Sequence, residues 1–436
     1  MAVNERYVVL GVAPVRREWF RRVGRWANDA TLPVEFVKCI STTEVISRLE
    51  SGRPFSALLA DASSAGLDRD VIDLANAVGC SPIIIDHGLV DRDWLELGAR
   101  AVMPERFDSG DLQGLLEEHA IPIGRGDSAT ASTTQDAGND GRHGRVVTVT
   151  GAGGLGSSTI AMALAQGLVT FGQRQPLLLA DMALRSSQAM LHDARDVVPG
   201  LTELIESHRL GVPNPTDAGA TIHTFPERGY DLLLGLRHER DWISIAPRAL
   251  SATWTTLTNR YETTVCDVTG DLDGASETGS NDIEDRNRLA RMAVRQADLV
   301  LVVGAGGAWG IHHLVRTILA LIDIGVTADR LMPVVNHAPR QPRARAAITG
   351  AVGDLLLTRV ADAHLVPSPL FVPTRRSLEA ALRDGDPIPS GIASPLSAAV
   401  DAMLERQQSH DGPAHRALSG PPAVVPGSVG TWSETP

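Results

Sequence analysis

Residues 146–164, VVTVTGAGGLGSSTIAMAL, decide the fold of this chain. A short β-branched run is followed by four glycines within six positions, Gly151, Gly153, Gly154 and Gly156, and then by an apolar segment of helical composition. Glycines in such a loop let successive backbone N–H groups turn toward an anion at the positive end of the following helix. The stretch therefore predicts a phosphate-binding loop between a strand and a helix.

The loop departs from the consensus G-x-x-x-x-G-K-[ST] at one position. Gly151, Gly156 and Ser158 match the consensus, whereas Ser157 stands where the consensus has lysine. Without the lysine, the alternative is an ordinary glycine turn between any strand and helix of an α/β sheet. The order of the segments that follow favours the phosphate loop.

Composition excludes several classes of protein. The 436 residues carry a formal net charge of −12, which argues against bulk electrostatic binding to nucleic acid or to an anionic membrane. Cys39, Cys80 and Cys266 occur singly, so the sequence predicts neither a disulfide framework nor a zinc site. No signal pattern is present, and no apolar run reaches the roughly 18 residues of a membrane span. We expect a cytoplasmic protein without direct membrane insertion.

Residues 1–123 predict a first α/β domain. The apolar runs YVVLGVA, FVKCI, SALLAD, PIIID and GARAVMPERF alternate with helical segments near residues 18–28, 43–50 and 72–78. Strands that alternate with helices within one domain's length indicate a parallel sheet covered on both faces.

This first domain resembles a two-component receiver domain, with Asp61 at the phospho-acceptor position. Gly11 and Val12 stand where a receiver has an acidic pair that holds magnesium, and Glu105 stands where it has a lysine. Without these groups the charge of a transferred phosphoryl group would not be compensated. We therefore expect a degenerate receiver-like domain that docks proteins; the alternative is regulated phosphorylation of Asp61.

Three further segments complete the expected organisation. Residues 124–144 are rich in Gly, Ser, Thr and Asp and predict a flexible linker. Residues 145–406 form the second domain, in which the acidic stretch 270–287 predicts a mobile surface loop. Residues 407–436 carry prolines and small residues without helical periodicity and predict a disordered tail.

Polar side chains end three apolar runs of the second domain. Asp181 ends PLLLAD and Asp267 ends TTVCD, where a carboxylate can act on magnesium or its bound water. Asn336 ends LMPVVN, and its carboxamide has the paired donor and acceptor that suit the edge of an adenine.

Over residues 7–403 the order, spacing and sequence of these segments resemble the MinD and ParA superfamily of deviant phosphate-loop ATPases. The receiver-like first domain narrows the resemblance to the CpaE and TadZ branch, and in particular to the actinobacterial septum site-determining proteins called Ssd. The family motif reads K-G-G-x-G-K-[ST]-T. In this chain Ala152 and Ser157 replace both lysines.

The resemblance implies ATP and magnesium as ligands. The backbone from Gly153 to Thr159 would surround the phosphates, and Asn336, Val372 and Pro373 would lie beside the base. Ser158 and Asp267 would hold magnesium. Asp181 is the candidate catalytic carboxylate, although Ala183 stands where relatives often have a second one.

The loss of the two lysines is expected to affect ATP binding much less than ATP hydrolysis. Each lost charge-assisted phosphate hydrogen bond costs about 1.5 to 3 kcal/mol, which binding can survive. In this family the first lysine of the motif reaches the phosphates of a dimer partner, and losing a group with such an arginine-finger role removes about 10³ to 10⁵ in rate. Arg185 could substitute electrostatically, although a surface arginine is the plainer interpretation. We expect little or no ATP hydrolysis.

The resemblance further implies a spatial regulator of cell division, or of the placement of a Flp pilus or secretion machinery. Its partners would be division proteins, or pilus and secretion proteins, which would recruit it to the septum or pole. Members of this family commonly form homodimers, so the resemblance also implies a homodimer. DNA binding through Arg340, Arg343 and Arg345 is disfavoured in an acidic chain. Two alternatives remain: an active MinD or ParA-type ATPase, and a scaffold that binds no nucleotide.

Overall fold

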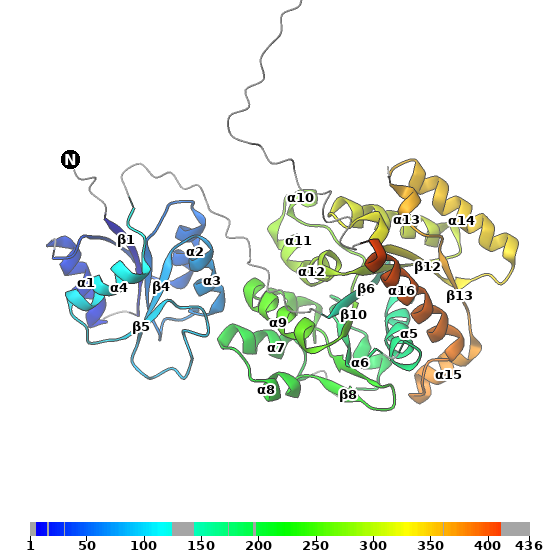
Figure 1. Cartoon of the computed structure of the whole chain (residues 1–436), viewed down its shortest axis with the longest axis horizontal. Helices are drawn as coiled ribbons and strands as arrows, with labels where there is room; N and C mark the ends of the chain where they lie inside the picture. The colour runs from blue at the N-terminus through cyan, green and yellow to red at the C-terminus, as the bar shows by residue number, and fades with distance from the viewer. Residues whose placement is uncertain are drawn as a thin grey trace, which may run out of the picture. The chain divides into compact units, whose positions relative to one another are not determined.

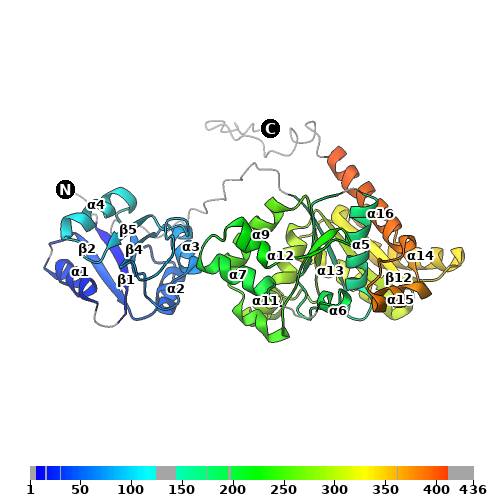
Figure 2. The same ribbon diagram turned by 90° about the horizontal axis from the view of Figure 1, so that it is seen from below.

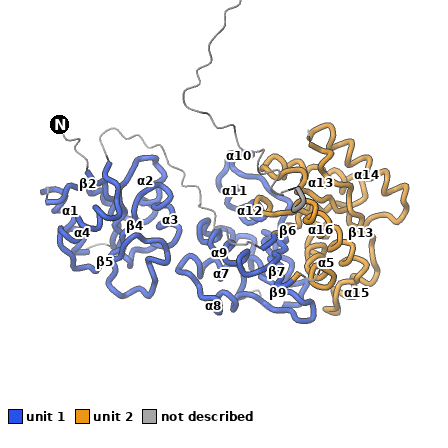
Figure 3. Tube along the Cα trace, in the orientation of Figure 1, with its two compact units in different colours: residues 1–145, 175–293 blue, residues 146–174, 294–436 orange. Residues whose placement is uncertain are grey.

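The computed structural model describes residues 6–14, 17–29, 31–123, 144–172, 174–194, 198–360 and 362–410. The chain divides into two compact units, shown in Figure 3. Unit 1 is Met1–Arg145 with Gln175–Ala293, and unit 2 is Val146–Arg174 with Val294–Pro436. Apart from Gly144, the predicted linker lies outside the described residues, as does the predicted tail from residue 411 onward.

The first part of unit 1 is a five-stranded parallel sheet with helices between its strands (Figure 1). Its strand order is β2-β1-β3-β4-β5, the flavodoxin-like order of doubly wound folds. The predicted α/β fold of this region is therefore confirmed. The elements are β1 (Tyr7–Val12), α1 (Glu18–Asn28), β2 (Val34–Cys39), α2 (Thr42–Glu50), β3 (Ala57–Asp61), α3 (Arg69–Ala77), β4 (Ser81–Asp86), β5 (Ala101–Pro104) and α4 (Ser109–His119).

Two apolar cores cover the two faces of this sheet. Leu58 and Ala60 of β3 pack with residues of α2 and α3, whereas Ala57 and Leu59 pack with residues of α1 and α4. The alternation follows from strand geometry, because successive side chains point to opposite faces. Burial on both faces explains why these strands read as nearly continuous apolar runs.

The second part of unit 1 carries the two predicted carboxylate strands. Its first elements are β7 (Leu177–Asp181), α6 (Gln188–Leu191), α7 (Leu201–Leu210), α8 (Pro215–Ala220), β8 (His223–Phe225) and β9 (Tyr230–Leu233). They are followed by η1 (Glu239–Ser244), α9 (Pro247–Arg260), β10 (Thr263–Asp267), α10 (Ala275–Thr278), α11 (Asn281–Arg286) and α12 (Arg288–Gln296).

Unit 2 contains the glycine loop. Its elements are β6 (Arg145–Gly151), α5 (Ser157–Thr170), β11 (Leu299–Ala305), α13 (Ala308–Asp323), η2 (Ala328–Arg330), β12 (Leu331–Ala338), α14 (Pro342–Leu357), η3 (Ala363–Leu365), β13 (Leu370–Pro373), α15 (Arg376–Asp384) and α16 (Ser390–His410). The second sheet of the chain has the order β13-β12-β11-β6-β10-β7-β9-β8. β8 pairs antiparallel with β9, whereas β6–β11, β11–β12, β12–β13, β7–β10 and β7–β9 pair parallel. The predicted mainly parallel sheet is confirmed.

Helix α5 is buried along most of its length because α16 packs against it (Figure 2). The two helices approach closely at Gly167, where a Cβ atom would lie 2.4 Å from the backbone oxygen of Ala393. The buried amide of Gln166 also donates to the Ile388 oxygen and accepts from its N–H, at 2.9 and 2.7 Å. Helix α5, which follows the glycine loop, is therefore fixed by α16 and by the residues just before α16.

Two expectations about irregular segments need correction. Residues 270–287 contain α10 and α11, so they are not a structureless loop. The buried Arg291 pairs with Glu277 at 3.3 Å, and Asn287 donates to the Asp273 oxygen at 2.8 Å, which orders the segment. Helix α16 also extends to His410, beyond the predicted start of the tail.

No helix in the described part of the chain is long and apolar enough to cross a membrane.

Candidate functional site

The glycine loop joins the end of β6 to the start of α5. Gly154 and Gly156 have φ values of +81° and +86°, a left-handed conformation that favours glycine. Gly151 lies against β11, where a Cβ atom would approach the Val303 oxygen to 2.5 Å. Leu155 is buried, whereas Gly153 and Gly154 are exposed. The loop is thus anchored at its ends and at Leu155, with its two middle glycines facing outward.

The start of α5 suits an anion. Its N-cap is Gly156, which has no capping side chain, and its first turn carries no acidic residue. The first N–H groups of a helix have no partner within the helix, and the helix dipole favours negative charge there. Ser157, Ser158 and Thr159, the predicted phosphate and magnesium residues, are half-buried in this first turn.

Asn336 of β12 holds the loop. Its Nδ2 donates to the Leu155 oxygen at 2.9 Å, and its Oδ1 accepts from the His337 N–H at 2.9 Å. A Cβ atom on Gly156 would lie only 2.5 Å from the Asn336 Nδ2. Pro373 ends the neighbouring strand β13, paired with Ala338. The structure thus brings Asn336 to the loop, while its predicted contact with a base remains a prediction.

Replacing Gly156 by alanine is expected to lower the melting temperature and to loosen the loop. A left-handed alanine costs about 1 to 2 kcal/mol, and the added methyl group would displace the Asn336 amide. Gly153→Ala is the matched control, because its Cβ meets nothing within 4 Å and its φ is not positive. Calorimetric melting of both variants checks the expectation. Equal melting temperatures for the two would show that Asn336 does not hold the loop.

The two predicted carboxylates end neighbouring strands of unit 1. Asp267 of β10 pairs in register with Asp181 of β7. Asp181 is fully buried, and its carboxylate accepts hydrogen bonds from the N–H groups of Ser187 and Gln188 at 3.0 and 2.9 Å, with Ala183 at 3.3 Å. Burial raises the pKa of Asp181, an effect that the three N–H donors oppose. Asp181 therefore organises the turn that follows its strand.

Gln188 is a residue of this region that sequence reasoning missed. Its Nε2 donates to the Asp267 Oδ2 at 2.7 Å, while its backbone N–H donates to Asp181. It is fully buried at the first position of α6 and joins the two carboxylates. The only signal in the sequence is a polar residue among small and apolar ones in SSQAML, which is too common to single it out.

The carboxylate of Asp267 is a suitable magnesium donor when a polyphosphate supplies other ligands. Among the described residues no cluster of three or more His, Cys, Asp or Glu side chains could hold a metal. Magnesium is usually held in proteins by one or two oxygen side chains together with water and substrate phosphates. Arg185, the candidate substitute cation, is exposed and pairs with Glu239 at 2.9 Å.

The first α/β fold encloses Asp61, which the sequence placed as a candidate phospho-acceptor. The fully buried carboxylate of Asp61 accepts from the Trp19 Nε1 at 2.8 Å, contacts the His87 Nε2 at 3.0 Å and pairs with Arg17 at 3.2 Å. Ser63 donates to it from its backbone N–H at 3.1 Å and from its hydroxyl. Burial alone would raise the pKa of Asp61, but the hydrogen bonds from Ser63, Trp19 and His87 lower it below its ordinary value.

The positions at which a receiver has its acidic pair and its lysine hold different groups in this chain. A Cβ atom on Gly11 would lie 2.3 Å from the ring of Phe36 and 2.9 Å from that of Phe20, so aromatic rings fill the space beside this position. Glu105 lies 3.5 Å from the His87 Nδ1. An internal arginine and a histidine thus surround the carboxylate that a receiver would leave open to a phosphoryl donor.

No family model matches the chain, and no curated protein matches it. Solved structures do match. A ParA family ATPase from Chlorobium tepidum shares 15% identity over 60% of this chain and 95% of its own, with a TM-score of 0.44. The septum site-determining protein MinD of Pyrococcus horikoshii, complexed with Mg-ADP, shares 16% over 63% of this chain and 99% of its own, with a TM-score of 0.42.

The MinC:MinD cell division protein complex of Aquifex aeolicus also matches, with 18% identity over 61% of this chain and 96% of the matched chain and a TM-score of 0.42. The solved structures to which this chain is similar are thus ATPases of the ParA and MinD type.

Proposed function

We propose that this chain is a spatial regulator of the MinD and ParA type, which binds Mg-ATP at its glycine loop and hydrolyses it little or not at all. The loop carries the proposal. It has two left-handed glycines, it is held by Asn336, and it leads into a helix start without an acidic residue. Ala152 and Ser157 stand in place of the two family lysines. The backbone is arranged for an anion, and the cations that speed phosphoryl transfer are missing from the loop.

In this proposal the backbone N–H groups of residues 153–159 bind the phosphates. Ser158 and Asp267 supply oxygen atoms to magnesium, and Asn336 and Pro373 lie near the base. Bound Mg-ATP would bring the polyphosphate and the divalent cation; the chain would supply donors that orient them. Slow hydrolysis is supported by Asp181, whose carboxylate is engaged by three backbone N–H groups.

The resemblance to the CpaE and TadZ branch, and to septum site-determining proteins, supports a role in placing the division septum or a pilus or secretion assembly. Partner proteins of those assemblies would recruit the chain to the septum or pole, and the nucleotide-bound form would act as a homodimer. Affinity purification from the native cell, followed by mass spectrometry, tests this part. Recovery of division proteins favours the septum, and recovery of pilus or secretion proteins favours the other role.

Isothermal titration with Mg-ATP tests the nucleotide proposal. We expect saturable binding to the full chain. Gly153→Asp should weaken it at least about tenfold, because the added carboxylate stands at the exposed loop where the phosphates would lie, and a charge-assisted contact is worth about 1.5 to 3 kcal/mol. Gly153→Ala, which adds a methyl group in open space, should bind as the parent does.

Titration and a phosphate-release assay distinguish the two alternatives from the proposal. A scaffold that binds no nucleotide would release no heat of binding in the parent. An active ATPase would release phosphate over hours at the rate of intact relatives when its partner is added. Either result would remove the proposal of a nucleotide-binding regulator with a silent site.

A further inference from the structure

Three consecutive residues at the start of α3 in the receiver-like fold contact helices α7 and α9, which lie more than 130 positions further along the chain in the same unit. They are Asp68, Arg69 and Asp70. Each makes a different contact. Asp70 and Arg69 bind backbone groups at a helix end, and Asp68 pairs with an arginine side chain.

Asp70 caps the start of α9. Helix α9 begins at Pro247 after Ala246, which makes no capping hydrogen bond of its own. The Asp70 Oδ1 accepts a hydrogen bond from the backbone N–H of Arg248 at 2.6 Å. This N–H belongs to the first turn, where no carbonyl of the helix itself can accept it. A carboxylate also carries the charge that a helix N-terminus favours.

Arg69 caps the end of α7. Helix α7 ends at Leu210, followed by Gly211. The Arg69 Nε donates to the His208 oxygen at 2.8 Å, and its Nη2 donates to the Gly211 oxygen at 3.3 Å. The His208 oxygen belongs to the last turn, whose carbonyls have no partner within the helix, and the Gly211 oxygen follows directly after the helix. The helix dipole favours a cation at this end.

Asp68 fixes the relative position of α3 and α7. Its Oδ2 pairs with the Arg209 Nη1 at 2.7 Å, while its Oδ1 caps α3 by accepting from the Val71 N–H at 3.3 Å. The Arg209 guanidinium is held in place by Glu206, which binds it through both oxygens at 2.6 Å. Arg209 is therefore oriented toward α3 by a residue of its own helix.

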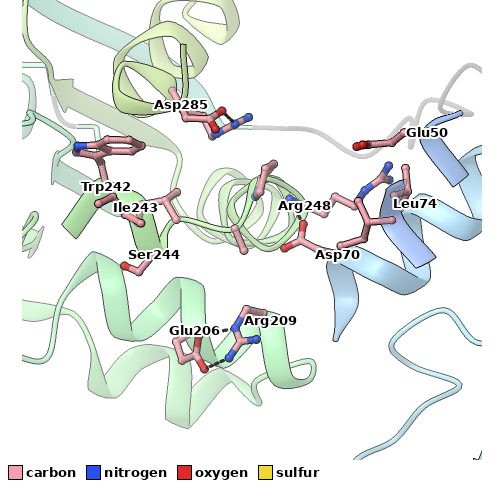
Figure 4. Close-up of a pocket in the computed structure, with 15 residues that line it drawn as sticks. Glu50, Asp70, Leu74, Glu206, Arg209, Trp242, Ile243, Ser244, Arg248 and Asp285 are labelled. Atoms are coloured by element: carbon pink, nitrogen blue, oxygen red, sulfur yellow. Dashed lines mark hydrogen bonds and ion pairs between the residues drawn. The ribbon is translucent and has the colours of Figure 1, made fainter. Parts of the chain in front are cut away.

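A cavity of about 730 Å³ lies beside these contacts, lined by Leu74 of α3, Glu206 of α7 and Trp242 among others. Figure 4 shows Asp70 beside Arg248, and Arg209 joined to Glu206 on the helix nearby. Because the space next to the contacts is not filled by side chains, polar attachments rather than a closed apolar core define this contact.

We propose that α3 is a docking helix whose first residues recognise the open ends of α7 and α9, so that the receiver-like fold and the α7–α9 layer move as one body. The occupant of this surface on α7 and α9 is the receiver-like fold of the same chain. Helix α9 leads through two residues into β10, which ends at Asp267, so the contact links the position of the receiver-like fold to the strand of the candidate magnesium donor.

Spin-label distances in the full chain test the proposal. Cys39, Cys80 and Cys266 are buried, so cysteines introduced at the exposed Glu117 of α4 and Thr255 of α9 can be labelled selectively. We expect one narrow distance distribution in this labelled parent. The double variant Arg69→Ala and Arg209→Ala should broaden it at least twofold. Arg48→Ala is the matched control, because Arg48 pairs with Glu44 of its own helix at 2.7 Å, and it should leave the distribution narrow.

A broad distribution in the labelled parent would overturn the proposal, as would an unchanged narrow one in the double variant. Circular dichroism of each variant shows whether the folds are intact. If the double variant unfolds, the single variants Arg69→Gln and Arg209→Gln replace it. Each keeps most of the side-chain volume while removing the charge, and broadening in both supports the docking role whereas broadening in neither contradicts it.

Discussion

Lysine at positions 152 and 157 together is expected to raise the affinity for Mg-ATP and to start measurable hydrolysis. Each restored charge-assisted contact with a phosphate is worth about 1.5 to 3 kcal/mol, or about one to two decades in the dissociation constant. The group with the arginine-finger role should add about 10³ or more in rate. Ala152 and Ser157 are both only half-buried, so each position can accept a longer side chain without filling the core.

Titration with Mg-ATP and phosphate release measure the two effects separately. The matched control is methionine at both positions, which adds a side chain of similar length without charge and should change neither quantity. Lysine at position 157 alone should improve binding, and lysine at position 152 alone should act chiefly on the rate in a dimer. If the double lysine variant gains neither affinity nor rate, the two substitutions are not what silences the site.

The fold was predictable because its signals are local. Apolar runs such as 56–61 and 82–86 are bounded by turn residues and buried on both faces, which is the signature of parallel strands. The sequence placed Asp181 and Asp267 each at the end of an apolar run, and in the structure the two residues pair in register at the ends of β7 and β10.

Contacts between distant segments were not predictable in this way. Gln188 reaches Asp267 across 79 positions, and Asn336 reaches Leu155 across 181. Each depends on which loops the folded sheets bring together, and a single buried amide leaves no periodic pattern in the sequence. The contact of Arg69 with the end of α7 could not be predicted either. An arginine in the first turn of a helix usually indicates a solvated surface.

The first α/β fold holds a buried carboxylate, Asp61, whose partners all come from the same fold. Sequence comparison with a receiver identifies missing groups at Gly11 and Glu105, but it does not show what replaces them. The structure shows that Arg17, Trp19 and His87 surround the Asp61 carboxylate, so the negative charge is neutralised from within. A buried carboxylate that is fully hydrogen-bonded is costly to remove, because its partners are then left without an acceptor.

Replacing Asp61 by asparagine is therefore expected to destabilise the receiver-like fold by about 3 kcal/mol, since breaking a buried charge pair by removing one partner typically costs 3 to 5. The amide NH₂ would face N–H donors on one side of the former carboxylate. Hydrogen exchange of the peptides that cover β1, β3 and β4 should accelerate by about two decades. Asp86→Asn is the matched control, because Asp86 ends the neighbouring strand and accepts one exposed hydrogen bond from Gly88 at 2.9 Å.

The pH dependence of Asp61 supplies a second measurement with a defined sign. Its pKa is lower in the folded chain than the ordinary value, so its ionised form stabilises the fold at every pH above about 4. The stabilisation is lost as the pH falls from about 4 through the lowered pKa. Asp61→Asn should lack this loss, so the exchange rates of the variant and the parent should converge in acid. Equal exchange at neutral pH in Asp61→Asn and Asp86→Asn would instead mean that Arg17 and His87 do not depend on the Asp61 charge, and that the enclosed carboxylate has no structural role.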